Sequence, residues 1–205
     1  MVVLGTTGNK DSELLNMMMK IFKLILLVSI MAEPSIEGIF MIGRENRMIY
    51  LYRDINALID DTIKRIGLGS KDASTLLFNT GMVESKYQAL MQYPSKIARS
   101  YFQVEPNTAY DIFKNYLFYR KGLWYSVVEA CELDEKYKEN IPTVEECKRL
   151  LTINIPFAIC MARLVYRRAP ARLPKSNDVE AQAKYWVKYY NAGGKGTEEK
   201  FLASL

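Results

Sequence analysis

Apolar residues recur every three or four positions along most of the chain, a spacing that predicts amphipathic helices. The first such stretch runs from Ile55 to Ile66 and is expected to end at the glycines that follow it. Ser70 is a suitable N-cap for a second helix that reaches roughly Leu90. Thr143, with Glu146, offers a capping box for another. Further helices are predicted over Asp111–Arg120, Trp124–Cys131, Thr143–Thr152, Ile155–Arg167 and Asp178–Tyr190, followed by a short one after Thr197.

Two stretches depart from the helical period. Residues 38–43 and 47–53 are β-prone runs on either side of polar residues, which predicts a hairpin. Tyr101, Phe102 and Gln103 alternate aromatic and polar groups as an extended segment does, and Pro106 is then suited to open a helix. The expected fold class is therefore mainly α, with a small β element or irregular loop around residues 93–104.

An apolar run covers residues 21–32, with lysines before and within it. It is shorter than the roughly 20 residues that span a bilayer. The residues after it form a poor signal-peptide cleavage site, so a buried or docking helix is the favoured interpretation. Residues 1–53 are accordingly expected to form an N-terminal docking extension, and residues 54–205 one helical domain.

The chain contains no histidine. Because imidazole is the usual general base near pH 7 and the commonest zinc ligand, this chain alone cannot build a Ser-His-Asp, Cys-His or His-ligated zinc site. Cys131, Cys147 and Cys160 lie outside any CxxC spacing, and we interpret them as small core residues. Acid or base chemistry must therefore rest on carboxylates, lysine, tyrosine or cysteine, and no metal site is indicated.

The formal charge of +5 is concentrated in the last third, because residues 143–205 hold 11 Lys and Arg against 6 Asp and Glu. Such a face suits DNA, membrane headgroups or an anionic polysaccharide, and an ordinary solvated surface accounts for it equally well. The same part of the chain carries four aromatic residues that suit either stacking on sugars or nucleobases or packing in the core: Tyr185, Trp186, Tyr189 and Tyr190. The segment 193–197 lacks the spacing of a Walker phosphate loop.

Glu84 lies near the C-terminal half of its predicted helix, beside Met82, Val83 and Tyr87. A carboxyl group on a half-apolar face loses hydration, which favours its neutral form. Cleavage of a glycosidic bond requires a protonated acid of this kind, because the leaving sugar oxygen must gain a proton. The alternative is a solvated surface charge. Downstream, aromatic rings and the Gln103 amide suit the apolar faces and acetamido groups of amino sugars.

The pair Glu84-Ser85 is followed by Ala98-Arg-x-aromatic-Phe-Gln-x-Glu-Pro-x-Thr108. This order resembles the lysozyme-like superfamily, and it is most similar to the lytic-transglycosylase-type and virion-associated peptidoglycan hydrolases of tailed bacteriophages. The similarity covers roughly residues 70–205 and includes the segments Arg163–Arg167, Leu173-Pro174 and Tyr185–Asn191. It implies a lysozyme-like helical domain whose chemistry needs no metal or organic cofactor.

The resemblance also implies roles for individual residues. Glu84 would be the general acid and base. Transglycosylase relatives need one carboxyl group because the acetamido group of the substrate assists, whereas hydrolases use a second carboxylate. Glu105 is the candidate for that second role, and Asp111 is a less favoured one. The residues expected to bind the glycan are Ser85, Tyr87, Tyr101, Phe102, Gln103 and Thr108.

The chain departs from the family pattern where glycine is usual, at Ser100 and at residues 95–97. Glycine there permits close backbone approach and positive φ, so its replacement is expected to narrow or reshape the cleft. Two functions stay open. One is an enzyme of the phage particle that cuts peptidoglycan glycan strands in the host periplasm or cell envelope during genome delivery. The other is a structural tail or internal head protein that keeps the fold without turnover and docks on other virion proteins through residues 1–53. A nucleic-acid-binding module that uses the basic C-terminal third of the chain is a further, less favoured possibility.

Overall fold

Contacts between residues divide the chain after Leu51 into two units, and the computed structural model describes the second, residues 52–205. The apolar run at 21–32 and most of the predicted hairpin lie outside the described residues. Tyr52 and Arg53, at the end of that predicted hairpin, are helical. They belong to a helix that continues through residue 65 and stops before Gly67, whose φ of 69° lies in the left-handed region that favours glycine.

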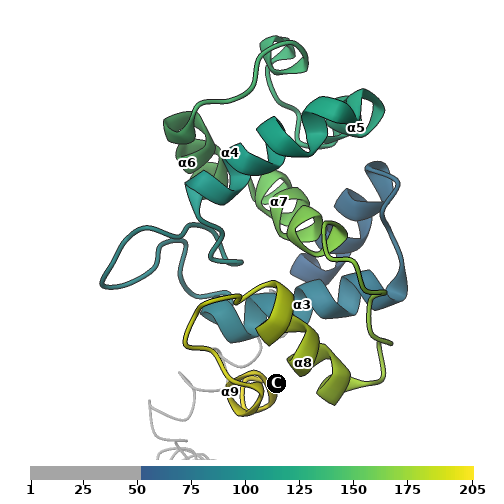
Figure 1. The fold of residues 1–205 in the computed structure, drawn as a ribbon, viewed down its shortest axis with the longest axis vertical. Coiled ribbons are helices and arrows are strands. Elements are labelled where there is room, and N and C mark those ends of the chain that lie inside the picture. Colours follow the sequence, from purple (N-terminus) through teal and green to yellow (C-terminus); the bar gives the residue numbers. More distant parts are fainter. Residues whose placement is uncertain (1–51) are drawn as a thin grey trace, which may run out of the picture. The chain divides into compact units, whose positions relative to one another are not determined.

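Helices build nearly all of the regular structure in the described part of the chain (Figure 1). After the helix at 52–65 come α3 (Lys71–Ser85), α4 (Pro106–Asn115), α5 (Lys121–Ala130), α6 (Val144–Ile153), α7 (Ile155–Arg167), α8 (Val179–Tyr189) and α9 (Glu198–Leu202), with 3-10 turns at Leu117–Tyr119 and Glu135–Lys138. Within residues 52–205 the β pairing consists of two isolated bridges, Met91 with Arg99 and Arg99 with Val104. The mainly α fold class is confirmed.

Side-chain caps begin several of these helices where the sequence places them. Ser70 Oγ accepts the Ala73 N–H at 3.1 Å, and Thr197 Oγ1 accepts the Lys200 N–H at 3.2 Å. Each cap satisfies a backbone N–H that has no partner within its helix. The predicted starts of α3 and α9 are therefore confirmed.

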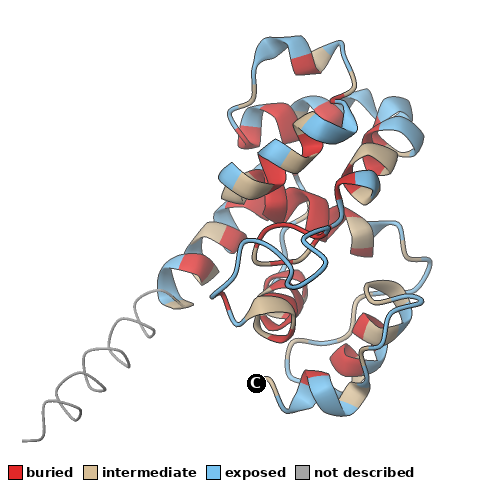
Figure 2. Ribbon diagram, turned by 90° about the vertical axis from the view of Figure 1, so that its left-hand side faces the viewer, coloured by how far each residue is buried: buried red, intermediate tan, exposed pale blue. Residues whose placement is uncertain are grey.

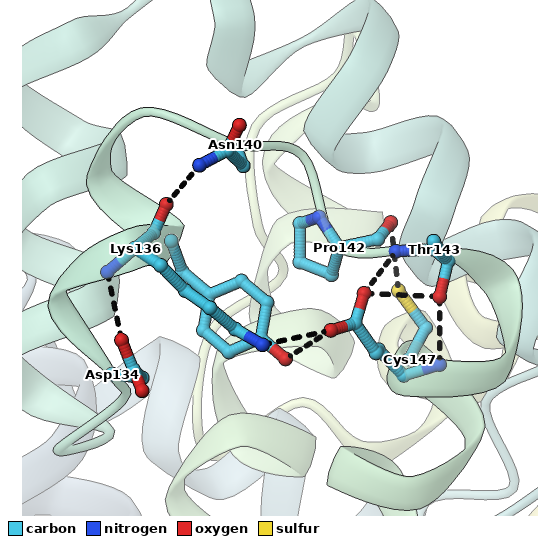
Figure 3. A network of polar contacts seen from close by, with 8 residues as sticks. Asp134, Lys136, Asn140, Pro142, Thr143 and Cys147 are labelled. Carbon is cyan, nitrogen blue, oxygen red and sulfur yellow. Dashed lines mark hydrogen bonds and ion pairs between the residues drawn. The ribbon is translucent and has the colours of Figure 1, made fainter.

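The capping box at the start of α6 belongs to a wider polar network (Figure 3). Thr143 Oγ1 accepts the Glu146 N–H at 3.2 Å, and Glu146 Oε2 accepts the Thr143 N–H at 2.9 Å. The other carboxylate oxygen accepts the Tyr137 hydroxyl at 2.8 Å and Lys136 Nζ at 3.1 Å. These bonds, with that of the Thr143 N–H largest, lower the pKa of Glu146 to about 2. One carboxylate thus ties the turn at 135–138 to α6.

The predicted bounds of two helices differ from those in the structure. α3 ends at Ser85 and does not reach Leu90, because Lys86 and Tyr87 adopt left-handed φ values of 52° and 55°. The Tyr87 ring thereby turns back over Gly81 in α3. The helix predicted over Asp111–Arg120 starts at Pro106, the residue expected to open a helix, and ends at Asn115, before the predicted end at Arg120. Proline fits the first turn of a helix because the missing N–H would have no partner there.

The core surrounds α7, which is buried along most of its length and contacts α3, α4, α5 and α6 (Figure 2). Phe157 of α7 stacks on Phe113 of α4, with ring centroids 6.1 Å apart, and Trp124 of α5 meets Phe113 edge-on at 5.7 Å. All three cysteines are buried, as predicted, and Cys131 and Cys160 lie with their sulfur atoms 3.5 Å apart. A second buried cluster joins Val83, Ala183, Trp186 and Phe201 of α3, α8 and α9.

Among the described helices, none alone has the length and apolar character needed to cross a membrane. Only α6 and α7 taken together meet that requirement, and they are bent by 114° at the break between them.

Candidate functional site

A cleft of about 630 Å³ lies between the C-terminal end of α3, the segment 92–108 and the end of α8 with the loop that follows it. Polar side chains dominate its lining. Those that line it include Glu84, Gln92, Gln103, Glu105, Thr108, Asn191, Lys195 and Lys200, together with Trp186 and Tyr190. The cleft therefore brings residues from the middle and from the end of the sequence to one place.

Glu84 is half-buried in this cleft, in the last turn of α3. The indole Nε1–H of Trp186 donates a hydrogen bond to Glu84 Oε1 at 3.0 Å. Loss of hydration raises the pKa of Glu84 to about 7, against the opposing effects of the Trp186 hydrogen bond and the Lys200 charge. A carboxylic acid of this kind keeps its proton near neutral pH and can donate it to a bound group.

Close packing fixes the Trp186 side chain that meets Glu84. The residue is 1% exposed, and its ring centroid lies 5.6 Å from that of Phe201 in α9. A Cβ atom at Gly196 would come within 2.2 Å of the indole, so the loop after α8 can lie against the ring only with glycine there. Trp186 is therefore a fixed hydrogen-bond donor.

Tyr190, at the end of α8, links the cleft to the turn on its other side. Its hydroxyl donates to the Phe102 carbonyl oxygen at 2.8 Å, and its ring lies 5.0 Å from that of Tyr166. Burial raises the pKa of Tyr190, and the negative charge of Glu84 adds to this rise. The phenol thus remains a protonated donor.

The segment predicted to be extended, Tyr101–Gln103, is a turn, and this prediction is wrong. The backbone closes the turn, because Arg99 and Val104 exchange N–H to carbonyl hydrogen bonds of 2.9 Å and the Gln103 N–H donates to the Ser100 carbonyl oxygen at 3.1 Å. Ser85 Oγ then donates to the Tyr101 carbonyl oxygen at 2.7 Å. The Glu84-Ser85 pair is thereby attached to the turn that forms the opposite wall.

Gln103 and Asn191 hold the two buried side-chain polar atoms that lack a hydrogen-bond partner within residues 52–205. Gln103 Nε2 donates to the Ser100 carbonyl oxygen at 2.7 Å and to that of Ala89 at 3.2 Å, which fixes its Oε1 as the unpaired acceptor. The unpaired atom of Asn191 is the donor Nδ2. Both residues line the cleft, but these two atoms are themselves buried, so a ligand reaches them only if the side chains move.

Not every predicted site residue reaches the cleft. Gln103, Glu105 and Thr108 line it together with Glu84. Tyr87 and Phe102 are only 2% and 1% exposed. They pack behind the wall with their rings 6.2 Å apart, and so they cannot stack on a sugar. Ser85 and Tyr101 are likewise absent from the lining, and they support the wall through the hydrogen bond between them.

Asp111, the less favoured second carboxylate, lies outside the cleft lining. It pairs with Arg168 at 2.7 Å and accepts a hydrogen bond from Asn115 Nδ2 at 2.5 Å. These contacts, with the Asn115 bond largest, lower the pKa of Asp111. Glu105 is exposed and its side chain makes no hydrogen bond or ion pair with residues 52–205, so it is the second carboxylate that a ligand in the cleft can meet.

Ser100, which stands where the family pattern has glycine, does not itself line the cleft. Ser100 has the left-handed φ of 66° that favours glycine, but its side chain is buried and does not line the cleft. Its Oγ accepts the Phe102 N–H at 3.2 Å, which offsets part of the backbone strain. The serine thus keeps the backbone path that glycine would give.

Sequence patterns did not identify Trp186, Tyr190, Asn191 or Lys200 as cleft residues. The four-residue spacing of Trp186 and Tyr190 places both on one side of α8, but only the fold brings that side to Glu84.

Within the described part of the chain, no group of three or more potential ligands is placed to hold a metal ion. Comparison of the chain with protein-family models, curated proteins and solved structures gives no match.

Proposed function

We propose that this chain is a phage virion-associated enzyme with a lysozyme-like helical domain that cleaves the glycan strands of peptidoglycan, as a lytic transglycosylase or a muramidase. The single observation that carries the proposal is the cleft position of Glu84 with a pKa of about 7. A protonated glutamic acid there donates its proton to the oxygen that leaves when the bond between two sugars breaks.

The polar groups around Glu84 suit an amino sugar. An acetamido group has one N–H donor and one carbonyl acceptor, and the amide side chains of Gln92, Gln103 and Asn191 on the cleft lining offer both kinds of partner. The half-buried Tyr190 on the lining supplies aromatic area, whereas Trp186 is 1% exposed and serves as the hydrogen-bond donor to Glu84. The cleft volume of about 630 Å³ lies within the range of pockets that hold small ligands, so it has room for part of a glycan strand.

The role of Glu105 differs between a muramidase and a lytic transglycosylase. As a second carboxylate in the same cleft, it would position a water molecule or stabilise the oxocarbenium ion in a muramidase. In a transglycosylase, the acetamido group of the substrate attacks instead, and the product ends in an anhydro sugar. Glu84 donates the first proton in both cases.

The motif residues behind the resemblance also support the proposal. The Glu84-Ser85 pair contacts the turn at 98–104 through the 2.7 Å hydrogen bond from Ser85 to Tyr101. Tyr190, from the C-terminal part of the resemblance, bonds to Phe102 in the same turn. Three separate segments of the sequence thus meet at one acidic residue. In a phage particle, residues 1–53 would dock on other virion proteins, and the enzyme would act in the host cell envelope during genome delivery.

The proposal is tested with purified peptidoglycan and mass spectrometry of the released fragments. The full chain is expected to release muropeptides, and Glu84→Gln is expected to release at least about 100-fold less, because the amide cannot donate the proton. Glu180→Gln, an exposed first-turn residue of α8, is the matched control and should keep full activity. Anhydro ends identify a transglycosylase, and reducing ends identify a muramidase.

Glu105→Gln completes the experiment. Loss of activity in this variant together with reducing ends supports the hydrolytic role of Glu105, whereas full activity with anhydro ends supports the single-carboxyl mechanism. If the unmodified chain releases nothing, the enzymatic proposal fails and the structural virion role takes its place.

A further inference from the structure

A second hollow, of about 270 Å³, lies where the chain leaves α7. Three arginines line it, Arg163 and Arg167 from α7 and Arg172 from the loop that follows, and no aspartate or glutamate does. We call these residues the arginine pocket. Its position and lining residues are distinct from those of the cleft that holds Glu84.

Arg163 differs from the other arginines of the pocket because it is buried, with only 7% of its surface exposed. Its Nε–H donates to the Leu68 carbonyl oxygen at 3.1 Å, and within residues 52–205 it forms no ion pair. Buried arginines in proteins are ordinarily paired with an anion. Burial lowers the pKa of Arg163, and the neighbouring charge of Arg167 lowers it further. An anion in the hollow would relieve both effects.

The other two arginines add charge at the same place. Arg167 follows Arg163 by one helical turn, a spacing at which like charges repel. The negative end of the α7 dipole accounts for a cation in the last turn, where Arg167 lies, but Arg163 lies a turn earlier and inside the protein. The next residue, Arg168, pairs with Asp111 at 2.7 Å, whereas Arg163, Arg167 and Arg172 form no ion pair within residues 52–205.

The loop that carries Arg172 is anchored at the neighbouring residue. Tyr185 of α8 donates its hydroxyl hydrogen bond to the Ala171 carbonyl oxygen at 2.9 Å. Pro170 and Pro174 restrict the backbone on either side. The loop is therefore already ordered in the free protein, so binding of a ligand at Arg172 loses less conformational entropy.

We propose that the arginine pocket binds a phosphate group. Guanidinium groups present paired N–H donors that match the oxygen atoms of phosphate, and a dianion balances the positive charges of three arginines lining one hollow better than a single carboxylate does. The hollow exceeds the size of inorganic phosphate, so it has room for the ester group of a soluble phosphomonoester or of a lipid headgroup. This inference does not depend on the activity of Glu84.

The first test uses the full chain at constant ionic strength, with inorganic phosphate as the ligand. Phosphate is expected to raise Tm by roughly 2–4 °C at saturation, whereas acetate at equal ionic strength is expected to have no effect. Arg172→Gln, at an exposed loop position, should weaken phosphate binding at least about tenfold in calorimetric titration. Lys184→Gln removes one positive charge from an exposed site outside the pocket and should bind phosphate unchanged.

Arg163→Lys tests the buried position. It keeps the charge but loses the paired donors, so weaker phosphate binding is expected. Because this variant can also disturb packing, its circular dichroism and its Tm without phosphate are compared with those of the unmodified chain. Arg172→Gln carries the decision if Arg163→Lys is unfolded.

The second test identifies the source of the phosphate group. Vesicles containing phosphatidic acid, which carries a phosphomonoester, are compared with phosphatidylcholine vesicles and with a soluble phosphomonoester. Binding to phosphatidic acid that falls in Arg172→Gln and not in Lys184→Gln indicates a lipid headgroup. Binding of the soluble ester alone indicates a small ligand. Absence of any phosphate effect, or duplex DNA binding that Arg172→Gln and Lys184→Gln weaken equally, overturns the proposal.

Discussion

The indole Nε1–H of Trp186 donates to Glu84 Oε1 at 3.0 Å, joining α8 to the last turn of α3 across 102 positions of sequence. This bond lowers the pKa of Glu84, whereas burial raises it more strongly, and the balance leaves the pKa at about 7. The pair therefore holds the carboxyl group at the point where it can change its protonation state near neutral pH.

The raised pKa of Glu84 predicts a stability change with pH. The folded chain keeps this proton up to about pH 7, whereas the unfolded chain releases it near the ordinary value of 4.5. Between these values the folded state binds more protons, so the free energy of unfolding falls as pH rises through this window and remains reduced above it. The full effect corresponds to about 3 kcal/mol.

Glu84→Gln removes this pH-dependent cost because the amide stays neutral and can still accept from Trp186. Urea unfolding is expected to show that Glu84→Gln is more stable than the unmodified chain at pH 8, by up to about 3 kcal/mol, and nearly equal to it at pH 4. Glu180→Gln serves as the exposed control and should show no such window. An equal effect of Glu84→Gln at both pH values would mean that Glu84 is already ionised near pH 4.

Trp186→Phe tests the hydrogen bond itself. Losing the donor raises the pKa of Glu84 further, so the alkaline limb of the pH–rate profile for peptidoglycan cleavage should move up by about one pH unit from pH 7. The lost packing against Phe201 costs roughly 1–3 kcal/mol of stability.

Trp124→Phe is the matched control for Trp186→Phe. Trp124 is equally buried, and its Nε1–H donates to the Tyr137 carbonyl oxygen at 2.6 Å, far from Glu84 in the fold. It should cost similar stability without moving the alkaline limb. If both variants move the limb equally, the effect comes from general loosening and not from the bond to Glu84.

Local chemistry explains which features the sequence could predict. The capping box at Thr143, the N-cap at Ser70 and the helical spacing of α7 depend on residues within a few positions of one another, and the structure has all three. The half-apolar setting of Glu84 was also visible, because Val83 and Tyr87 are close to it in sequence.

Local sequence patterns could not predict the features that depend on residues far apart in the sequence. The turn at 101–103 closes through backbone bonds between Arg99 and Val104, and Tyr190 of α8 bonds to Phe102 within it; neither contact follows from the alternation of polar and aromatic residues. The same alternation suggested that Phe102 faces the cleft, although tertiary packing buries it. Tertiary contacts therefore override local periodicity where the wall of the site is built.

Gly81→Ala tests how Tyr87 ends α3. A Cβ atom at Gly81 would lie 2.3 Å from the Tyr87 ring, which the hydroxyl bond to the Phe78 carbonyl oxygen holds at 2.9 Å. The ring has to move, so we expect a loss of about 2–4 kcal/mol in urea unfolding. Gly122→Ala, in α5 with open space around it, should instead gain about 0.5–1 kcal/mol. A neutral Gly81→Ala would show that the ring is free to shift.

At Ser100, backbone strain and a side-chain hydrogen bond have opposite effects on stability. Ser100→Gly relieves the left-handed φ of 66°, worth about 1 kcal/mol, and loses the bond from the Phe102 N–H, worth about 1 kcal/mol, so stability should change little. Ser100→Ala keeps the strain and loses the bond, and should cost about 1–2 kcal/mol. Because this side chain does not line the cleft, neither variant should change the KM for peptidoglycan more than about twofold. A large KM change in Ser100→Gly would place Ser100 in contact with the glycan.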